Sequence, residues 1–472
     1  MTEEAPLYET VAERIHALIE DGTLRAGDRL PSLRHLHDQW SVSVTTVLEA
    51  YRLLEDRGRV EARPRSGYYV RPNPHALVAE PKMTNPPRRP QRVRTDLVMR
   101  LHAEMNTPGT VRLGAAVPDL DLLPHRVLAR KVTEVMRRYP QTCHAYMTGA
   151  GHEPLRREIA RRMVDAGCTV SPSDVVITAG AQEGLFLALR ALTEPGDTVV
   201  VESPSYFGLL EILETLHLRA LEVRTHPRDG IDLDALDDAL RTEKVKACAL
   251  VSNFSNPLGS CMDDDKKRAC VELCAHHGVP IIEDDIYGEL SFDGPRPRAL
   301  KEHDRDGSVL YVSSFSKTIS PGFRIGWIVP GRFQEGAMYL KNMMSIAAPS
   351  IPQLVIAAYL QEGGYDRHLR GLRRLYRDNL QRAIAAIGEY FPEGTRATRP
   401  RGGQLLWVEM PRAVSAVQLY ERVAEQRISV APGVLFSASG RYQHCLRLNL
   451  ALRYDDRVDA ALATLGRYAS SQ

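Results

Sequence analysis

The chain has 472 residues, of which 43% are hydrophobic and 25% charged, so it is long enough for more than one domain. Its net charge of +2 does not by itself indicate a nucleic-acid-binding protein, so any DNA contact must depend on local placement of charge. The N-terminus carries acids and a proline where a signal peptide needs basic and apolar residues, and no apolar run approaches the roughly 20 residues that cross a bilayer, which predicts a cytoplasmic protein without a membrane partner.

The first elements along the chain are two predicted helices. Apolar residues recur at helical spacing from Leu7 to Ile19, and Asp21-Gly22 should end that helix. In "RLPSLRHLHDQW", Ser32 is placed to cap a second helix. A turn through Ser41 and Val42 then leads into the next element.

A third helix and a hairpin complete the first 70 residues. Ser43 should cap the helix "SVTTVLEAYRLLEDRG", and Gly58 should stop it. The segment "RVEARPRSGYYV" predicts two short strands around a turn at Pro64 to Gly67. Three helices followed by a hairpin form a winged helix-turn-helix.

The string "LPSLRHL…VSVTTVLEAYRLLEDRG…SGYYV" resembles the GntR-type DNA-binding domain over nearly all of residues 6–70. That resemblance implies a double-stranded DNA operator as partner. A helix N-terminus offers N–H groups to phosphate, and arginines add charge. Many relatives carry an arginine where this chain has Val44, whose side chain offers only an apolar contact. The expected DNA contacts are Arg34, Ser43, Thr45, Thr46, Arg63 and Arg65. The alternative for Arg34 is a surface salt bridge with Asp38, and the alternative for the two threonines is that they only help to start the helix.

Residues 71–108 lose apolar periodicity and fill with Pro, Asn and Arg, which predicts a linker. Seven Lys or Arg stand against two acids in residues 71–100, whereas residues 1–70 hold nine Arg and twelve acids. The basic excess therefore lies beyond the first domain. A solvated tether is favoured over a DNA contact for this segment.

From residue 109 to 472, short Val- and Ile-rich runs alternate with helical stretches. The alternation predicts an α/β domain with a mostly parallel sheet wrapped by helices. From about Arg370 the pattern changes to helices with a few strands, which predicts a smaller C-terminal α+β subdomain. The runs are "DVVITAG", "DTVVVESP", "KACALVSN", "VPIIEDD", "VLYVSS" and "FRIGWIVP".

Functional side chains follow these runs at the carboxyl ends of the strands, where ligands of open parallel sheets gather. Lys317 supplies an amine for a Schiff base with an aldehyde, and Asp284 a carboxylate to hold a pyridine nitrogen protonated. This pair is what pyridoxal phosphate requires. Asn256 and Tyr287 are expected donors to the ring oxygen, and Tyr206 an aromatic face against the ring. The phosphate is expected at a helix start with hydroxyls and a guanidinium, from Gly180, Ala181, Gln182, Ser314, Ser316 and Arg324.

Each signal is weak alone, but their order along the chain resembles fold-type I aminotransferases from about residue 110 onward. The segments that carry the resemblance are "YMTGAGHEPLRREIA", "ITAGAQEGL", "ESPSYFG", "SNPLG", "EDDIYGE", "SFSKTISPGFRIGW" and "CLRLNLA". By that resemblance Lys317 is the Schiff-base lysine and Asp284 the ring-nitrogen partner. Arg447 is the implied clamp for a substrate or effector carboxylate, with pairing to a surface acid as the alternative. Tyr146 would reach the phosphate of the neighbouring subunit in a homodimer.

A winged helix, a linker and this domain in one chain are similar to the MocR branch of GntR regulators. The resemblance implies a pyridoxal-phosphate-dependent transcription regulator that senses an amine, an amino acid or the coenzyme itself. Two rivals stay open: an active aminotransferase with a DNA-binding appendage, and a binding module in which the fold is only a dimerisation scaffold.

Seven cysteines are scattered along the chain, an odd number that argues against a disulfide framework. They are interpreted as reduced, mostly buried thiols. Cys270, Cys274, His276 and His277 cluster on a probable helix, but without a second ligand pair they indicate packing more than metal, so no metal is expected.

Overall fold

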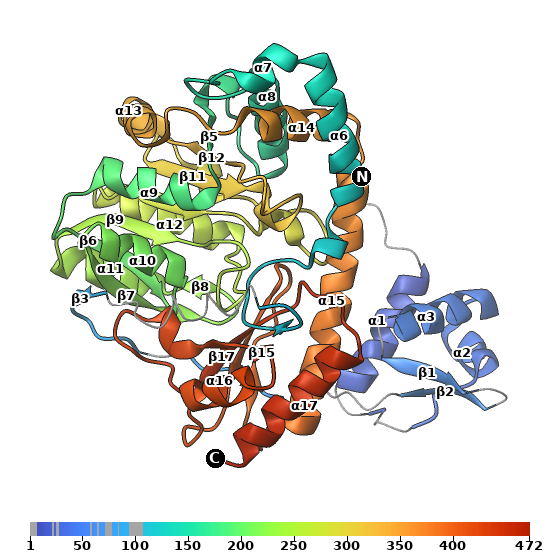
Figure 1. Cartoon of the computed structure of the whole chain (residues 1–472). Helices are drawn as coiled ribbons and strands as arrows, with labels where there is room; N and C mark the ends of the chain where they lie inside the picture. The colour runs from blue at the N-terminus through green and yellow to red at the C-terminus, as the bar shows by residue number, and fades with distance from the viewer. Residues whose placement is uncertain are drawn as a thin grey trace. The chain divides into compact units, whose positions relative to one another are not determined.

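The computed structural model describes residues 7–20, 23–24, 28–56, 59–63, 66–70, 78–83, 85–93 and 107–472 (Figure 1). The chain divides into two compact units, Met1–Leu77 and Val78–Gln472. Each unit has its own hydrophobic core. In the described part of the chain no helix is both long and apolar enough to span a bilayer.

The small unit has the expected three helices and hairpin: α1 (Leu7–Glu20), α2 (Leu33–Trp40), α3 (Val44–Asp56), β1 (Val60–Arg63) and β2 (Gly67–Val70). The strands β1 and β2 pair antiparallel. Ser32 caps α2 by accepting from the His35 N–H at 3.2 Å, and Ser43 caps α3 by accepting from the Thr46 N–H at 3.0 Å, as expected. The expected stops at Asp21-Gly22 and Gly58 and the turn at Pro64 and Arg65 lie outside the described residues.

Part of the segment expected to be a linker packs on the large unit. Val78 and Val93 are buried there. The Ala397 N–H donates to the Ala79 carbonyl at 2.9 Å, and β3 (Gln91–Arg92) is an edge strand of the main sheet, paired antiparallel with the strand Arg219–His226. These contacts are made by backbone groups at sheet edges, which composition does not reveal.

The large unit is built on a sheet in the order β3-β7-β6-β9-β10-β11-β12-β5, with β8 (Gly230–Ile231) paired to β7. Its strands include the six predicted runs: β5 (Val176–Thr178), β6 (Thr198–Ser203), β9 (Val245–Leu250), β10 (Ile281–Asp284), β11 (Val309–Ser314) and β12 (Gly326–Val329). The strand β7 (Arg219–His226) was not predicted, because charged residues interrupt its apolar run. The strands from β7 to β11 run parallel, whereas β12 is antiparallel to both neighbours.

Helices cover both faces of this sheet. Consecutive strand residues point to opposite sides, and because they are apolar, both faces of the sheet have to be buried. Val199 and Val201 of β6 pack in one core with residues of α9 and α10, while Val200 packs in another core with residues of α11 and α12. The helices are α6 (His125–Arg138), α7 (Pro140–His144), α8 (Glu153–Asp165), α9 (Ala181–Leu192), α10 (Phe207–Thr215), α11 (Leu233–Thr242), α12 (Asp264–His276), α13 (Gln334–Ser345) and α14 (Ser350–Gln361).

The expected smaller subdomain is present. Its four-stranded sheet has the order β13-β14-β17-β16, and three helices accompany it (Figure 1). The elements are β13 (Arg396–Ala397), β14 (Leu405–Glu409), β16 (Ala431–Pro432), β17 (Cys445–Asn449), α15 (Tyr365–Tyr390), α16 (Ala416–Ala424) and α17 (Asp456–Ser470). A separate pair joins β4 (Val111–Arg112) to β15 (Ile428–Ser429) in parallel.

All seven cysteines are buried and free. Cys274 lies against Cys248, with 3.9 Å between the two sulfur atoms, so it packs in the core below the sheet. His277 bonds to Asp237 through Nε2 at 2.9 Å. The Cys274 sulfur and the His277 imidazole therefore contact different partners.

Candidate coenzyme site and DNA-binding face

Several of the predicted site residues lie where strands of the main sheet end. The register aligns Ser314 of β11 with Gly326 of β12, and Gly326 with Thr178 of β5. Asp284, at the end of β10, is opposite Val312 in β11. The ends of these strands therefore bring the phosphate-binding candidates, the carboxylate and the segment leading to Lys317 to a common edge.

Lys317 ends a single turn of 3-10 helix, Phe315–Lys317, that follows β11 directly. Its Nζ donates to the Ala116 carbonyl at 2.6 Å. Burial, together with the positive charge of Arg447, lowers the pKa of the Lys317 ammonium to about 8, although Asp284 acts in the opposite direction. An appreciable share of Lys317 is therefore a neutral amine near physiological pH.

Asp284 is buried, and its Oδ1 has no hydrogen-bond partner among the described residues. Burial and the neighbouring Asp285 raise the pKa of the Asp284 carboxyl to about 7, against the attraction of Lys317. A buried carboxyl oxygen without a partner is costly, so this position suits a cationic donor brought by a ligand.

The hydroxyls of Tyr287 and Tyr206 both interact electrostatically with Asp284 and Arg447. The Tyr287 side chain is 1% exposed, and its hydroxyl has no hydrogen-bond partner within the described residues. Burial raises the pKa of both hydroxyls, to about 12 for Tyr206, so each is a neutral donor. A second unsatisfied polar group thus accompanies Asp284.

The residues predicted to bind the phosphate include the start of α9 and Arg324 beside it. Gly180 has a φ of +88°, and a Cβ there would collide with the guanidinium of Arg324. Arg324 Nη2 donates to the Ala179 carbonyl at 2.9 Å, which holds this cation beside the start of the helix. The Gln182 side chain donates to the Gly208 carbonyl at 3.0 Å, so Gln182 contributes its backbone N–H to the helix start. The cradle combines a helix N-terminus with a guanidinium, the donors that bind phosphate.

The hydroxyls before the lysine are also at this edge. Ser314 and Ser316 are both buried, and the Ser314 hydroxyl accepts from the Ser316 N–H at 3.4 Å. Ala181 is the first residue of α9. These residues therefore have the positions expected of them, and their contacts to phosphate stay a prediction.

Arg447 in β17 is fully buried, so the alternative of pairing with a surface acid is not what the structure has. Its Nη1 donates to Asn256 Oδ1 at 3.2 Å, and its Nη2 donates to the Gly114 carbonyl. The Nε has no hydrogen-bond partner in the part of the chain that the structure describes. Burial lowers the pKa of Arg447 to about 10, which leaves it charged at neutral pH. A buried cation without a carboxylate partner is suited to binding a ligand carboxylate.

Tyr146 follows α7 and is 79% exposed. An exposed tyrosine of this size has the access that a contact with a second subunit needs. Its role at a neighbouring phosphate stays a prediction.

On the small unit, Arg34 is exposed on α2, and Asp38 lies 3.9 Å from His37 instead of pairing with Arg34. Arg63 is less available than expected, because it pairs with Glu61 at 2.7 Å and covers the Tyr69 ring at 4.3 Å. Arg65 lies outside the described residues.

At the start of α3, Ser43, Val44 and Thr45 are exposed, while Thr46 is half-buried and bonds to the Ser43 hydroxyl at 2.8 Å. Val44 presents 40% of its surface. An apolar contact from this position is therefore sterically possible.

Sequence reasoning missed the backbone carbonyls of Gly114 and Ala116, which accept from Arg447 and Lys317. It also missed support behind the lysine: the Tyr365 hydroxyl donates to Thr318 Oγ1 at 2.7 Å, and His368 Nε2 bonds to the Thr318 carbonyl at 2.7 Å. No sequence pattern marks such contacts, because they join segments far apart in the chain.

The family comparisons agree with this division of the chain. The model for bacterial regulatory proteins of the gntR family matches residues 7–70, and the model for aminotransferase class I and II matches residues 109–465. The latter spans more than half of the chain. The chain belongs to the GntR-type regulators that carry an aminotransferase domain. This is the arrangement expected of the MocR branch, and the aminotransferase family is pyridoxal-phosphate-dependent.

Relatives of this GntR-type family align along almost the whole chain. An uncharacterized HTH-type transcriptional regulator of Escherichia coli, YjiR, is 39% identical over 97% of this chain and 98% of its own length. The HTH-type transcriptional regulator NorG of Staphylococcus aureus is 26% identical over 93% of this chain and 99% of its own. Both relatives therefore share the two-domain arrangement.

Among solved structures, LysN, an α-aminoadipate aminotransferase of Thermus thermophilus complexed with N-(5'-phosphopyridoxyl)-L-leucine, has a TM-score of 0.74 and 28% identity. The match covers 80% of this chain and 95% of LysN. The expected fold-type I architecture is confirmed.

Proposed function

We propose that this chain is a transcription regulator whose aminotransferase-like domain binds pyridoxal phosphate at Lys317 and senses an amine or amino acid there. One observation carries the proposal. Asp284 and Arg447 both act electrostatically on Lys317, and Asp284 and Lys317 follow neighbouring strands of the main sheet, in a chain that also has a winged helix. Because a chain that reads chromosomal DNA works where that DNA is, we place it in the cytoplasm.

The residues at the site fit the coenzyme. Bound pyridoxal phosphate supplies an electrophilic carbonyl carbon and an electron-withdrawing ring. Asp284 would hold the ring nitrogen, which gives its unpartnered Oδ1 a donor. Tyr287 and Asn256 would donate to the ring oxygen, and Tyr206 would lie against the ring. The N-terminus of α9, Arg324, Ser314 and Ser316 would hold the phosphate.

Lys317 would act as the nucleophilic amine and afterwards as a proton carrier, because its lowered pKa lets it gain and lose a proton near neutral pH. Arg447 would bind the carboxylate of an amino-acid effector. That carboxylate would accept from the Nε that has no partner among the described residues, and it would share Nη2 with the Gly114 carbonyl. An effector that alters the Gly114 contact would bind one of two arrangements more tightly, and this difference in affinity would shift the equilibrium between them.

A homodimer is part of the proposal. Tyr339, Met343, Met344 and Ile346 expose large apolar surfaces on or just after α13. Lys341 of the same helix donates to the Gly149 carbonyl at 2.8 Å, which links α13 to the loop that follows Tyr146. A second copy covering this face would bury these side chains and bring Tyr146 to the partner's phosphate.

The test uses the full-length chain and an operator fragment selected from random-sequence DNA. Added pyridoxal phosphate should give a visible absorbance that Lys317→Ala abolishes and that the exposed-site control Lys246→Ala retains. Candidate amines and amino acids that change this absorbance should change operator affinity. A chain that binds the operator but stays colourless with added coenzyme would contradict the sensing role.

An active aminotransferase is the second candidate, supported by the presence of Lys317, Asp284 and Arg447 together. Steady turnover of an amino acid with a keto acid, without any operator binding, would decide for it. The scaffold alternative predicts that Asp284→Ala leaves regulation unchanged.

A further inference from the structure

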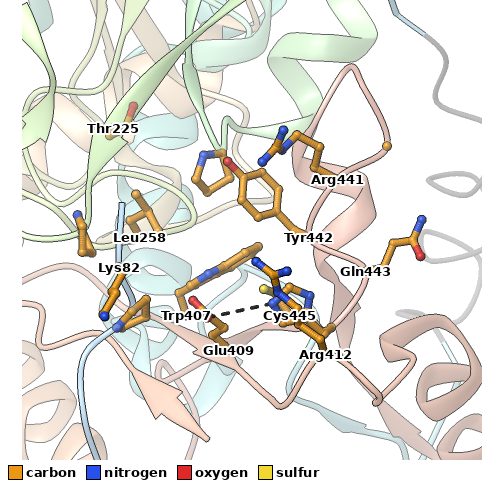
Figure 2. A pocket seen from close by; sticks show the side chains of 15 residues that line it. Lys82, Thr225, Leu258, Trp407, Glu409, Arg412, Arg441, Tyr442, Gln443 and Cys445 are labelled. Atoms are coloured by element: carbon orange, nitrogen blue, oxygen red, sulfur yellow. Dashed lines mark ion pairs between the residues drawn. The ribbon is translucent and has the colours of Figure 1, made fainter. Parts of the chain in front are cut away.

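The large unit has a cavity of about 490 Å³ that none of the coenzyme-site residues lines, here called the Trp407 cavity. Its walls come from the 78–83 stretch, from loops of the main sheet and from the small subdomain (Figure 2). A volume of this size is within the range of small-molecule sites. The residues that define its chemistry are Lys82, Trp407, Glu409, Arg412, Arg441 and Tyr442.

Positive charge dominates the cavity. Among the described residues, Lys82, Arg412 and Arg441 form no ion pair. The acidic Glu409 is already shared, because its Oε1 lies 3.6 Å from Arg396 Nη1 and 4.0 Å from His444 Nε2. Three cations without carboxylate partners around one cavity favour an anionic ligand.

The cavity also has an aromatic wall. The rings of Trp407 and Tyr442 meet edge to face, with centroids 5.7 Å apart. The Tyr442 hydroxyl is fixed by a 2.8 Å bond with the Ser203 hydroxyl. Figure 2 shows the Trp407 ring with Lys82 on one side and Arg412 on the other. A ligand with an apolar body and separated negative groups would match this arrangement.

The Trp407 cavity is connected to the effector clamp through the small-subdomain sheet. Trp407 of β14 is the direct cross-strand partner of Arg447 in β17. Phe436 contacts both, since its ring centroid is 5.5 Å from that of Trp407 and 5.1 Å from the Arg447 guanidinium carbon. A shift of the Trp407 ring would therefore change the packing around Arg447.

The cavity also touches the stretch of chain that follows the DNA-binding unit. Lys82 lies twelve positions after Val70, the last residue of the wing. The residues just before it are anchored: the Val78 carbonyl accepts from Arg399 at 2.7 Å, and Glu80 pairs with Arg228. We call residues 78–83 the exit segment. A ligand bound to Lys82 would therefore contact this anchored segment directly.

We propose that the Trp407 cavity is a second ligand site, which binds a small molecule with at least two negative charges, a polycarboxylate or a phosphate ester. Arg412 and Arg441 hold the anion, and Lys82 brings the exit segment against it. Anion binding does not require Lys317, so the chain reads two inputs: an amine at the coenzyme and an anion at Trp407.

The experiment is calorimetric titration of the coenzyme-saturated full chain with citrate and, separately, with glycerol 3-phosphate; glycerol is the uncharged control. Coenzyme blocks the phosphate cradle, and its absorbance in each sample reports the first site. We expect one of the two anions to bind one per chain with a Kd below about 1 mM. The double variant Arg412→Gln/Arg441→Gln should weaken it at least about tenfold.

The matched control removes two exposed arginines of α15, Arg370→Gln/Arg374→Gln, and should leave the Kd unchanged. Lys317→Ala should also bind the anion, so a failure of the coenzyme assignment does not affect this result. The inference is overturned if neither anion binds, if both double variants weaken binding equally, or if Arg324→Gln abolishes it.

Amide hydrogen exchange supplies a second readout, because a ligand on Lys82 should slow exchange over residues 78–83. Exchange that is unchanged at saturating anion would refute the contact with the exit segment.

Discussion

Arg447 Nη1 donates to Asn256 Oδ1 at 3.2 Å, which orients the Asn256 amide. Because the oxygen is held by the guanidinium, the amide nitrogen of Asn256 is directed away and is available as a donor. One buried arginine thus orients Asn256 and also retains an Nε without a partner among the described residues.

Replacing Arg447 with Gln should separate recognition of the carboxylate from recognition of the amine. A hydrogen bond between charged groups contributes roughly 1.5–3 kcal/mol, so half-saturation by an amino-acid effector should rise about 10- to 100-fold. The decarboxylated amine should be affected little. Absorbance titration of the coenzyme-bound chain measures both, with Arg453→Gln, at an exposed position nearby, as the control. Equal losses for amino acid and amine would contradict the clamp.

Lys317 should capture pyridoxal phosphate with a pH dependence set by its pKa of about 8. Only the neutral amine is nucleophilic, so the capture rate should rise about tenfold per pH unit below that value and level off above it. Arg447 lowers this pKa, so Arg447→Gln should move the plateau to higher pH. Stopped-flow absorbance on the coenzyme-free chain measures the rate. A rate that still rises tenfold per unit at pH 9.5 would match an unperturbed lysine and contradict this prediction.

Asp284→Asn should stabilise the coenzyme-free chain at alkaline pH. The Asp284 carboxyl has its pKa raised from 3.8 to about 7, so its protonated form is retained in the fold. The contribution of this protonated carboxyl to the free energy of unfolding is fully present below pH 4 and is lost as pH rises through about 7. The reason is that the carboxyl ionises more readily in the unfolded chain, so rising pH favours unfolding. The amide does not ionise, so the variant should exceed the parent by on the order of a few kcal/mol at pH 8 and match it near pH 4.

Thermal unfolding of the large unit from pH 4 to 8 measures this difference. Asp293→Asn, at an exposed carboxylate, is the control and should show no such trend. The same Asp284→Asn variant should lose most of the stabilisation that added coenzyme gives the parent. A variant less stable than the parent at pH 8 would show that Asp284 already has a favourable partner.

Arg34→Ala should weaken binding to the selected operator and reduce the slope of log affinity against log salt by about one. The reason is that an exposed arginine without a carboxylate partner among the described residues is available to phosphate. Arg52→Ala is the matched control, because Arg52 is exposed but pairs with Glu49 at 2.8 Å. Fluorescence anisotropy at several salt concentrations gives the slope. If both variants lower affinity and slope alike, Arg34 has no specific phosphate contact.

The sequence alone determined the three helices and hairpin of the small unit, six strands of the main sheet and the side chains that follow those strands, whereas β3 and β7 were not predicted. The apolar runs that became β9, β10 and β11 are long enough to indicate buried parallel strands, and the residues after a parallel strand must lie at the same sheet edge. This is why the sequence alone predicts that Asp284 and Lys317 share one site. The caps Ser32 and Ser43 were equally local, since each acts on an N–H three residues away.

Tertiary structure decided what depends on contacts between distant segments. Only the fold brings Gly114 and Ala116 against Arg447 and Lys317, buries Arg447 instead of leaving it on the surface, and pairs Ala79 and Gln91–Arg92 with strands of the large unit. Backbone carbonyls and edge pairings leave no trace in residue type, because every residue carries the same amide group. The Trp407 cavity has the same origin: Lys82 is more than 300 positions from Arg412 and Arg441 in sequence, and the three meet only when the subdomain sheet packs beside residues 78–83.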